Sequence, residues 1–374
     1  MKKLTDEQTQ ILAAFKEKIV RHPRLHAVLE ELQARTLNPA GQPLSAVIGP
    51  TGAGKTTLLR QVERGLLETH AERLRTDPGF IPYVSVEARA PERGSFDWKR
   101  FYEDILEKAN EVHIELKRAF NETVPASIQK ESLSGCSTVT LRVAVEHMLR
   151  HRGLPPLLID ESQHFLKMAS GRRLLDQMDA LKSISNMTGV KIVLFGNYDL
   201  LALGQLSDQL ARRCREIHFG RYRLDDASDV QVFQNIVATF QRGLTTHGSL
   251  DLLHHWKYLY RGTLGCVGNL KDWLLEVLAE ALRSGRTEIM REDLQRTIRS
   301  EASLTKMAKD LRSGEDKWAQ REAKSQDLDR LLGFDSGGPD HPASFATGKP
   351  SEQGRRVGVR NQVRDAVGLA TALS

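Results

Sequence analysis

The residues best suited to bind a phosphate group form one short stretch, Gly-Pro-Thr-Gly-Ala-Gly-Lys-Thr at positions 49–56. This stretch satisfies the phosphate-loop pattern G-x-x-x-x-G-K-[ST], with a short apolar segment before it and an amphipathic one after it. Glycines are needed because a Cβ would obstruct backbone N–H groups that point toward an anion. An ordinary glycine-rich turn is the alternative. The expected nucleotide-binding residues of the loop are Gly49, Pro50, Thr51, Gly52, Ala53, Gly54, Lys55, Thr56 and Thr57.

Two side chains of the loop and two carboxylates have complementary chemistry. Lys55 would place a positive charge on the outer phosphates, and the Thr56 hydroxyl would coordinate magnesium. Asp160 and Glu161 end the apolar run 157–159, as expected where a buried strand delivers acids to the edge of a sheet. Asp160 would hold magnesium through water, and Glu161 would orient or deprotonate the attacking water. A helix cap is the alternative for such a pair.

Polar residues also flank two later apolar runs. Asn197 follows the run 191–195 and could bind the terminal phosphate or the attacking water, or serve only as a turn residue. Arg212, Arg213 and Arg215 lie where a helical pattern ends, and arginines there can simply complement the helix dipole. At a subunit boundary, Arg212 or Arg213 could instead reach a neighbour's nucleotide, which can raise the rate by about 10³ to 10⁵.

The segments that must position these residues alternate in type along the chain. Strand candidates lie at 45–48, 83–86, 157–159, 191–195 and 216–219, and helix candidates at 58–74, 98–116, 140–150 and 174–187. This alternation predicts an α/β fold with a parallel sheet that helices cover on both faces.

Patterns before and after the alternating region divide the chain further. Two helical stripes precede the first strand, and from about Asp225 successive helical patterns predict a small all-helical lid. Beyond Glu301 charged and polar residues dominate, which predicts a largely disordered or partner-binding tail. The expected regions are an N-terminal helical segment 1–43, the nucleotide-binding domain 44–224, the helical lid 225–300 and the C-terminal tail 301–374.

Composition limits the class of protein. The chain has 374 residues, of which 40% are hydrophobic and 27% charged, so it is neither collagen-like nor wholly disordered. A net charge of +6 favours an anionic partner. The apolar runs are far shorter than the roughly 20 residues that cross a bilayer, and the start lacks the apolar core of a signal peptide. We therefore expect a cytoplasmic protein without a membrane-spanning helix.

The order of phosphate loop, Asp-Glu strand, Asn-ended strand, Arg-rich helix end and helical lid resembles the AAA+ ATPases. Four further segments look like the TniB/TnsC branch of these proteins, which are ATP-dependent regulators of DNA transposition related in role to MuB of phage Mu. These segments are residues 23–26, 87–98, 160–164 and 265–273. The resemblance covers about residues 20 to 300.

The resemblance implies a role for each candidate residue. It assigns ATP and magnesium binding to Lys55 and Thr56, magnesium to Asp160, the catalytic base to Glu161, the first sensor to Asn197 and the arginine finger to Arg212 or Arg213. Where many AAA+ lids carry a nucleotide-sensing arginine, this chain has Lys271. A lysine keeps the charge but lacks the planar fork of arginine, which puts tight coupling between lid and hydrolysis in doubt.

The resemblance also implies partners. ATP-bound oligomers, as rings or helical filaments, would assemble on duplex DNA near the prokaryotic nucleoid, connect a target-selection factor to a transposase, and disassemble on hydrolysis. Candidate contacts to DNA phosphates are Arg89, Arg93, Lys99 and Arg100. The neighbouring aromatic residues have helical spacing and could equally be core, which would leave the basic residues as a solvated face. Subunit number, the identity of the transposase, the role of RNA in targeting and the function of the tail stay open.

Two other functions compete with this one. An ExeA-like AAA+ ATPase that acts on protein partners only would share the pattern Asp-Glu-x-Gln-His, but such proteins usually append membrane or wall-binding segments. A scaffold that binds ATP without hydrolysing it is disfavoured by Glu161 and the arginines. Binding to duplex DNA across a salt series distinguishes the first alternative, because phosphate-dominated binding weakens as salt rises.

Overall fold

The computed structural model describes residues 5–35, 37–38, 41–91, 96–109, 135–166, 172–203, 213–244 and 250–322. The chain divides into two units, Met1–Arg321 and Glu322–Ser374. Of the second unit only Glu322, the last residue of a helix, is described.

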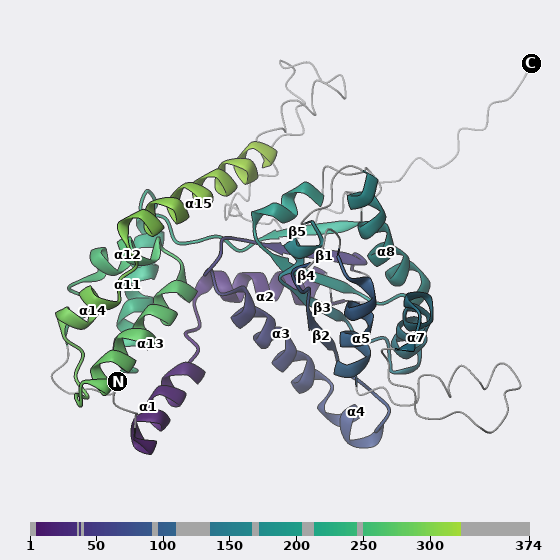
Figure 1. The fold of residues 1–374 in the computed structure, drawn as a ribbon, viewed down its shortest axis with the longest axis horizontal. Coiled ribbons are helices and arrows are strands. Elements are labelled where there is room, and N and C mark those ends of the chain that lie inside the picture. Colours follow the sequence, from purple (N-terminus) through teal and green to yellow (C-terminus); the bar gives the residue numbers. More distant parts are fainter. Residues whose placement is uncertain are drawn as a thin grey trace, which may run out of the picture. The chain divides into compact units, whose positions relative to one another are not determined.

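A parallel sheet of five strands, counted over the described residues, lies at the centre of the first unit (Figure 1). The strand order is β2-β3-β4-β1-β5. The register places Ile48 of β1 beside Gly196 of β4 and His218 of β5. Residues that follow these strands therefore meet at one edge of the sheet. The strands are β1 (Leu44–Ile48), β2 (Val84–Glu87), β3 (Leu157–Asp160), β4 (Ile192–Gly196) and β5 (Cys214–His218).

Each face of the sheet has its own hydrophobic core, because successive strand side chains point to opposite faces. Leu158 of β3 packs with α2 and α3 on one face, and its neighbour Ile159 packs with α5, α7 and α8 on the other (Figure 1). The predicted sheet covered by helices on both faces is confirmed. The covering helices are α2 (Pro23–Arg35), α3 (Lys55–Thr69), α5 (Trp98–Lys108), α7 (Thr138–His151) and α8 (Arg172–Thr188), and the short α4 (Ala71–Thr76) follows α3.

A third core belongs to the helices that follow the sheet. Phe233, Leu259 and Trp273 pack together in it, and Phe15 of the N-terminal helix α1 (Asp6–Glu17) joins them. The two helices of the N-terminal segment thus pack in different places, α1 against α13 and α2 against the sheet. The helices of this lid are α11 (Ala227–Gln241), α12 (Trp256–Thr263), α13 (Val267–Arg283) and α14 (Arg291–Thr297).

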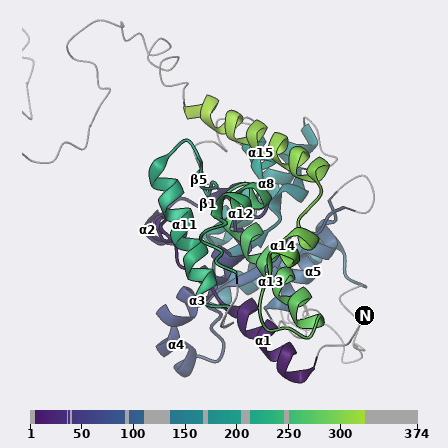
Figure 2. The same cartoon turned by 90° about the vertical axis from the view of Figure 1, so that its left-hand side faces the viewer.

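The start of the expected tail needs correction, because residues 301–322 form a helix, α15 (Figures 1 and 2). Leu304 and Leu311 are buried on its inner face, and the ring of Trp318, one more heptad along, stacks on His218 at the end of β5 with centroids 4.5 Å apart. Three apolar positions spaced seven apart form only a narrow stripe among charged residues. A prediction from composition alone therefore assigns this segment to a disordered or partner-binding tail. Residues 323–374 lie outside the described part of the chain.

Candidate nucleotide-binding site

The phosphate loop joins the end of β1 to the start of α3, as the sequence predicts. Gly52 and Gly54 have φ angles of 80° and 106°, in the left-handed region that favours glycine. Gly49 lies against the end of β5, where a Cβ would come 2.0 Å from the carbonyl oxygen of Phe219. Glycine is thus required at two positions by backbone conformation and at one by space.

Lys55 is the first residue of α3, and only 8% of it is exposed. Its Nζ donates to the carbonyl oxygens of Gly49 and Pro50, at 3.1 and 2.9 Å. Burial lowers the pKa of Lys55, while the negative charges of Glu161 and Asp160 act in the opposite direction. A lysine held between the loop and two acids is placed to bind phosphate oxygens.

Thr56 and Asp160, the two residues expected to hold magnesium, are in direct contact. Thr56 Oγ1 donates to Oδ2 of Asp160 at 2.9 Å, and the backbone N–H of Glu161 donates to Oδ1 at 2.9 Å. Burial raises the pKa of Asp160, and these two hydrogen bonds oppose the rise. A hydroxyl and a carboxylate supply the oxygen ligands that magnesium prefers, so the pair fits this ion. Among the described residues no group of three or more His, Cys, Asp or Glu side chains offers another metal site.

Glu161 lies directly after β3 and has a φ of 51°, which is unusual for a residue with a side chain. Its Oε2 accepts a hydrogen bond from Nε2 of Gln163 in the short 3-10 helix η2 (Ser162–Phe165). Oε1 of the same Gln163 accepts from the backbone N–H of Asn197 at 3.2 Å. Gln163 thereby connects the predicted base to the end of β4. It is not among the site residues that the sequence predicts, although an amide two residues after the acids was an available signal.

Asn197 caps the 3-10 helix η3 (Tyr198–Ala202). Its Oδ1 accepts from the backbone N–H of Asp199 at 2.9 Å, and its Nδ2 donates to Oδ2 of Asp199 at 2.9 Å. These bonds are those of a turn residue, which was the alternative to a sensor. The backbone of Asn197 nevertheless lies at the nucleotide edge, linked to Glu161 through Gln163. A sensor role for its side chain stays a prediction.

Of the two expected arginine fingers, Arg213 lies away from this edge. Arg213 precedes β5, whose first residue pairs with Leu44 at the start of β1, so Arg213 lies at the opposite edge from the phosphate loop. Its exposed guanidinium donates to Oδ1 of Asn186 at 2.6 Å. Arg215 forms an ion pair with Glu31 at 2.9 Å. Arg212 lies outside the described residues.

The lid contacts the phosphate loop through the first turn of α13. The backbone N–H of Asn269 donates to the carbonyl oxygen of Gly52 at 3.0 Å. Gly268 is so close that a Cβ on it would come 2.6 Å from the same oxygen. Neither residue is among those expected from the sequence, although both belong to a segment that resembles the TniB/TnsC branch.

Lys271, the expected nucleotide-binding residue of the lid, lies two positions further along α13. Burial lowers its pKa, and the charged residues that act on it are Asp272, Glu17, Arg60 and Lys16. These residues belong to α13, to α1 and to α3 beyond its first turn. Binding of nucleotide by Lys271 therefore stays a prediction.

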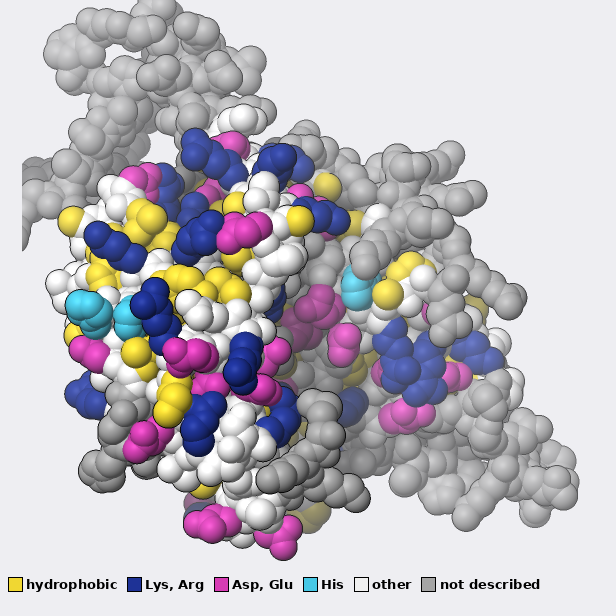
Figure 3. All heavy atoms as spheres, turned by 60° about the vertical axis from the view of Figure 1, so that its left-hand side comes forward, with side chains coloured by type: hydrophobic (Ala, Val, Ile, Leu, Met, Phe, Trp, Pro, Cys, Tyr) yellow, Lys and Arg dark blue, Asp and Glu magenta, His cyan; other side chains and the backbone are white. Residues whose placement is uncertain are grey.

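Two of the arginines expected to contact DNA, Arg89 and Arg100, are held by acids of α5. Arg89 forms a two-pronged pair with the buried Asp104, at 2.8 and 3.0 Å, and Arg100 pairs with the same carboxylate at 2.8 Å. Lys99 is partly exposed, and Arg93 lies outside the described residues. On the face that Figure 3 shows, Lys and Arg side chains are intermixed with Asp and Glu.

The aromatic residues beside these arginines belong to the hydrophobic core, which was the alternative to a DNA-contacting face. Phe96, Phe101 and Tyr102 are 5% exposed or less and belong to the core on one face of the sheet. Trp98 is partly buried and packs against that core. These rings are therefore explained by packing.

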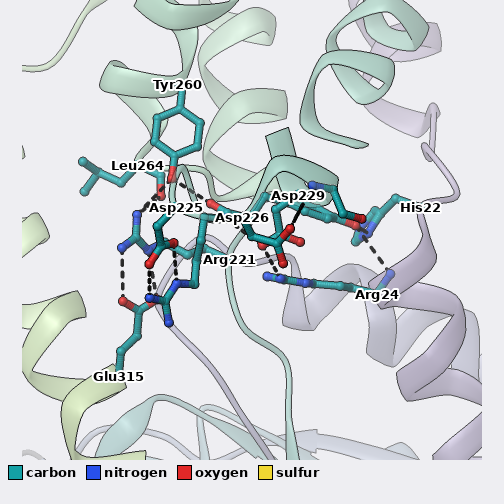
Figure 4. A network of polar contacts seen from close by, with 12 residues as sticks. His22, Arg24, Arg221, Asp225, Asp226, Asp229, Tyr260, Leu264 and Glu315 are labelled. Atoms are coloured by element: carbon teal, nitrogen blue, oxygen red, sulfur yellow. Dashed lines mark hydrogen bonds and ion pairs between the residues drawn. The ribbon is translucent and has the colours of Figure 1, made fainter. Parts of the chain in front are cut away.

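A second polar cluster surrounds the hinge, which we define as residues 219–226 between β5 and α11 (Figure 4). Arg221 forms two hydrogen bonds with the carboxylate of Glu315 on α15, at 2.9 and 3.1 Å. It also donates to the hydroxyl of Tyr260 on α12 at 3.0 Å, and that hydroxyl donates to the carbonyl oxygen of Tyr222 at 2.7 Å. The hinge is thus bound to both the lid and α15.

The same hinge is held from the N-terminal side by α2 and the residue before it (Figure 4). Arg24 forms an ion pair with Asp229 at 2.5 Å, and its guanidinium lies 4.5 Å from the centre of the Tyr222 ring. Nδ1 of His22 lies 2.9 Å from the hydroxyl of Tyr222. Arg24 lies in the segment 23–26 that resembles the TniB/TnsC branch, whereas Arg221 and Glu315 lie in none of the segments that carry this resemblance.

Comparisons with a family model and with solved structures both found matches. Residues 37–203 match the family model described as an AAA domain. The ORC1 protein of Aeropyrum pernix, solved in complex with DNA, is similar in structure with 19% identity and a TM-score of 0.50 over 77% of this chain and 67% of that chain. The ORC2 protein of the same organism, solved with ADPNP and ADP, has 13% identity and a TM-score of 0.48 over 76% and 70% of the two chains. A search of the curated proteins returned no match.

The fold is therefore that of an AAA+ ATPase, as expected, and an AAA domain implies nucleotide binding. No helix in the described part of the chain combines the length and apolar character needed to span a bilayer.

Proposed function

We propose that this protein is an ATP-hydrolysing switch that assembles on duplex DNA and connects target-site selection to a transposase, as the TniB/TnsC regulators do. The observation that carries the ATPase part is the convergence of Lys55, Thr56, Asp160 and Glu161 at one edge of the sheet. An ATP-binding scaffold would not need a carboxylate in the position of Glu161.

In this proposal each group at the edge has one task. Lys55 and the N–H groups of the loop bind the phosphates of ATP, and Glu161 orients the attacking water and accepts its proton. Thr56 and Asp160 would hold magnesium, which neutralises charge on the phosphates when it is bound. Asn269 and Gly268, in the first turn of α13, would transmit nucleotide binding from the loop to the rest of the lid, because both contact the loop at Gly52.

The position of Arg213 supports action on a neighbouring subunit. It precedes β5, and the phosphate loop follows β1, which runs parallel to β5. Five residues of strand span about 16 Å, which is too far for Arg213 to reach the phosphates of its own subunit. Hydrolysis would then depend on assembly, which is the property that a switch on DNA requires.

Binding to DNA is supported by properties of the whole chain rather than by one cluster of residues. It rests on the net charge of +6, on the resemblance to TniB/TnsC, and on the fold shared with the ORC1 protein that was solved with DNA. Arg89 and Arg100 could bind DNA phosphates only in competition with the carboxylate of Asp104. We therefore expect other basic residues to contribute.

The test combines ATP hydrolysis with assembly. Duplex DNA should stimulate hydrolysis by the wild type, and Glu161→Gln should bind ATP, hydrolyse it at least about 10²-fold more slowly and remain assembled on DNA in electron micrographs. Glu292→Gln, an exposed change on α14, is the control and should behave as wild type. A Glu161→Gln protein that stays monomeric with ATP and DNA would contradict the switch. Hydrolysis that ignores DNA would favour the protein-directed alternative.

A further inference from the structure

The geometry points to Gln163 as a positioning residue that fixes the carboxylate of Glu161 relative to the end of β4. This inference rests on the proposed ATPase function and adds a residue to it. Gln163 would not touch ATP itself and would act through Glu161.

The first support is the pair of bonds that the amide of Gln163 makes. Its Nε2 donates to Oε2 of Glu161, and its Oε1 accepts from the backbone N–H of Asn197 at 3.2 Å. A side-chain amide offers both a donor and an acceptor, and here the two ends serve two different strands. Replacing the amide by any single-function group would break one of the two links.

The second support is that the bridge has little freedom to move. Gln163 is 8% exposed, and a Cβ on Gly196 would come 2.7 Å from its Oε1. The other end of the bridge, β4, is a central strand whose side chains are buried. The amide is therefore anchored to the end of a buried, central strand of the sheet.

The third support is that Glu161 needs such an anchor. A glutamate has three side-chain torsions, and Glu161 leaves β3 with a left-handed backbone at the start of a short 3-10 helix. Misplacing a catalytic group by about 1 Å can cost about 10²-fold in rate. A bond from a buried amide would keep the carboxylate in one place without binding substrate.

Two variants separate positioning from packing. Gln163→Met keeps the length of the side chain but removes both bonds. Gln163→Glu keeps an acceptor for the N–H of Asn197 but sets one carboxylate against another at Glu161. If Gln163 acts through Glu161, both variants should lower kcat by about 10-fold or more and leave the Kd for ATP within about threefold of wild type.

A double-mutant cycle tests the route of the effect. In a Glu161→Gln background, measured in single turnovers, Gln163→Met should cause less than a twofold further loss, because the group that it positions is already gone. Gln320→Met, on the exposed side of α15, is the matched control and should change neither kcat nor Kd. Thermal unfolding of every variant shows that the protein compared is folded.

The outcomes are distinct. A wild-type kcat in Gln163→Glu would overturn the inference. This variant keeps an acceptor for the N–H of Asn197 but loses the donor to Glu161, so hydrolysis would not depend on that donor. A raised kcat, a parallel loss of ATP binding, or independent effects in the cycle would overturn it as well. A wild type that hydrolyses no ATP, with or without DNA, would refute the proposed function and the positioning role together. If the wild type hydrolyses ATP but the Gln163 variants do not show the expected loss of kcat, only the positioning role of Gln163 is refuted.

Discussion

The phosphate site and the hinge both join residues that are far apart in the sequence, but they do so by different means. Thr56 meets Asp160 across 104 positions because Asp160 ends β3 and Thr56 follows β1 in the same parallel sheet. Arg221 meets Glu315 across 94 positions because α15 lies along the hinge. In the first case strand topology brings the residues together, and in the second case helix packing does.

This difference predicts different responses to mutation. The phosphate site stands on a sheet whose two cores do not depend on Lys55 or Glu161, so changes there should alter nucleotide chemistry and spare the fold. The ion pairs Arg221–Glu315 and Arg24–Asp229 are partly buried around the hinge, so breaking them should weaken the fold and spare nucleotide binding.

The largest expected effect tests the phosphate side of this comparison. Lys55→Ala removes the cation that faces the phosphates and should weaken ATP binding by at least about 10²-fold, measured by titration calorimetry. The free energy of unfolding should change little, because the hydrogen bonds of Nζ go only to loop carbonyls among the bonds described. Lys306→Ala, exposed on α15, is the control.

If Lys55→Ala binds ATP as tightly as the wild type, the phosphate loop is not the ATP-binding site. A large loss of stability would show that the two regions are not separable in this way.

The next effect tests the hinge side. Arg221→Met leaves the partly buried Glu315 without its partner and should lower the free energy of unfolding by about 2 to 4 kcal/mol in urea. The Kd for ATP should stay within a few-fold of wild type. Arg223→Met, two positions away, breaks a pair with Asp225 in which both side chains are more than half exposed, and should cost less than about 1 kcal/mol.

Equal stability losses in Arg221→Met and Arg223→Met would mean that burial at the hinge does not set the strength of its ion pairs. A selective loss of ATP binding in Arg221→Met would instead assign the hinge to the nucleotide site.

The contrast also explains what could be predicted from the sequence. The phosphate loop, Asp160 and Glu161 were accessible because each lies beside an apolar strand, and parallel strands deliver such residues to one edge. The strands themselves follow from runs such as 192–195, which are apolar throughout because both faces of the sheet are covered.

The missed residues lack that local context. The roles of Arg221, His22 and Glu315 arise only when three separate helices pack around the hinge. The spacing of residues within any one segment gives no sign of this packing. The helix α15 was missed because its apolar stripe is narrow, although its heptad spacing was visible in Leu304, Leu311 and Trp318. Gln163 lay inside a quoted motif, but its two partners are visible only in three dimensions.

The smallest expected effect concerns pH and sharpens the account of the hinge. The backbone N–H of Leu25 donates to Nδ1 of His22 at 3.3 Å, so this nitrogen is an acceptor and the hydroxyl of Tyr222 donates to it as well. Protonation of Nδ1 would place a hydrogen on it, so that it would face two other donors, the N–H of Leu25 and the hydroxyl of Tyr222, and lose both hydrogen bonds. Burial, with a smaller contribution from the charge of Arg24, lowers the pKa of His22 to about 4.

Because the folded protein resists this protonation, the stability that His22 contributes is present above the unfolded pKa of about 6.5 and is lost as pH falls toward 4. Between pH 7.5 and 5 this loss amounts to about 2 kcal/mol. His22→Gln should therefore lose less stability than the wild type over that range in urea unfolding at both pH values, and the exposed change His26→Gln should follow the wild type. The other titrating groups are common to all three proteins, so the difference between their curves isolates His22. Identical curves for His22→Gln and wild type would mean that the hinge tolerates a charged imidazole, and that its polar contacts are looser than their burial indicates.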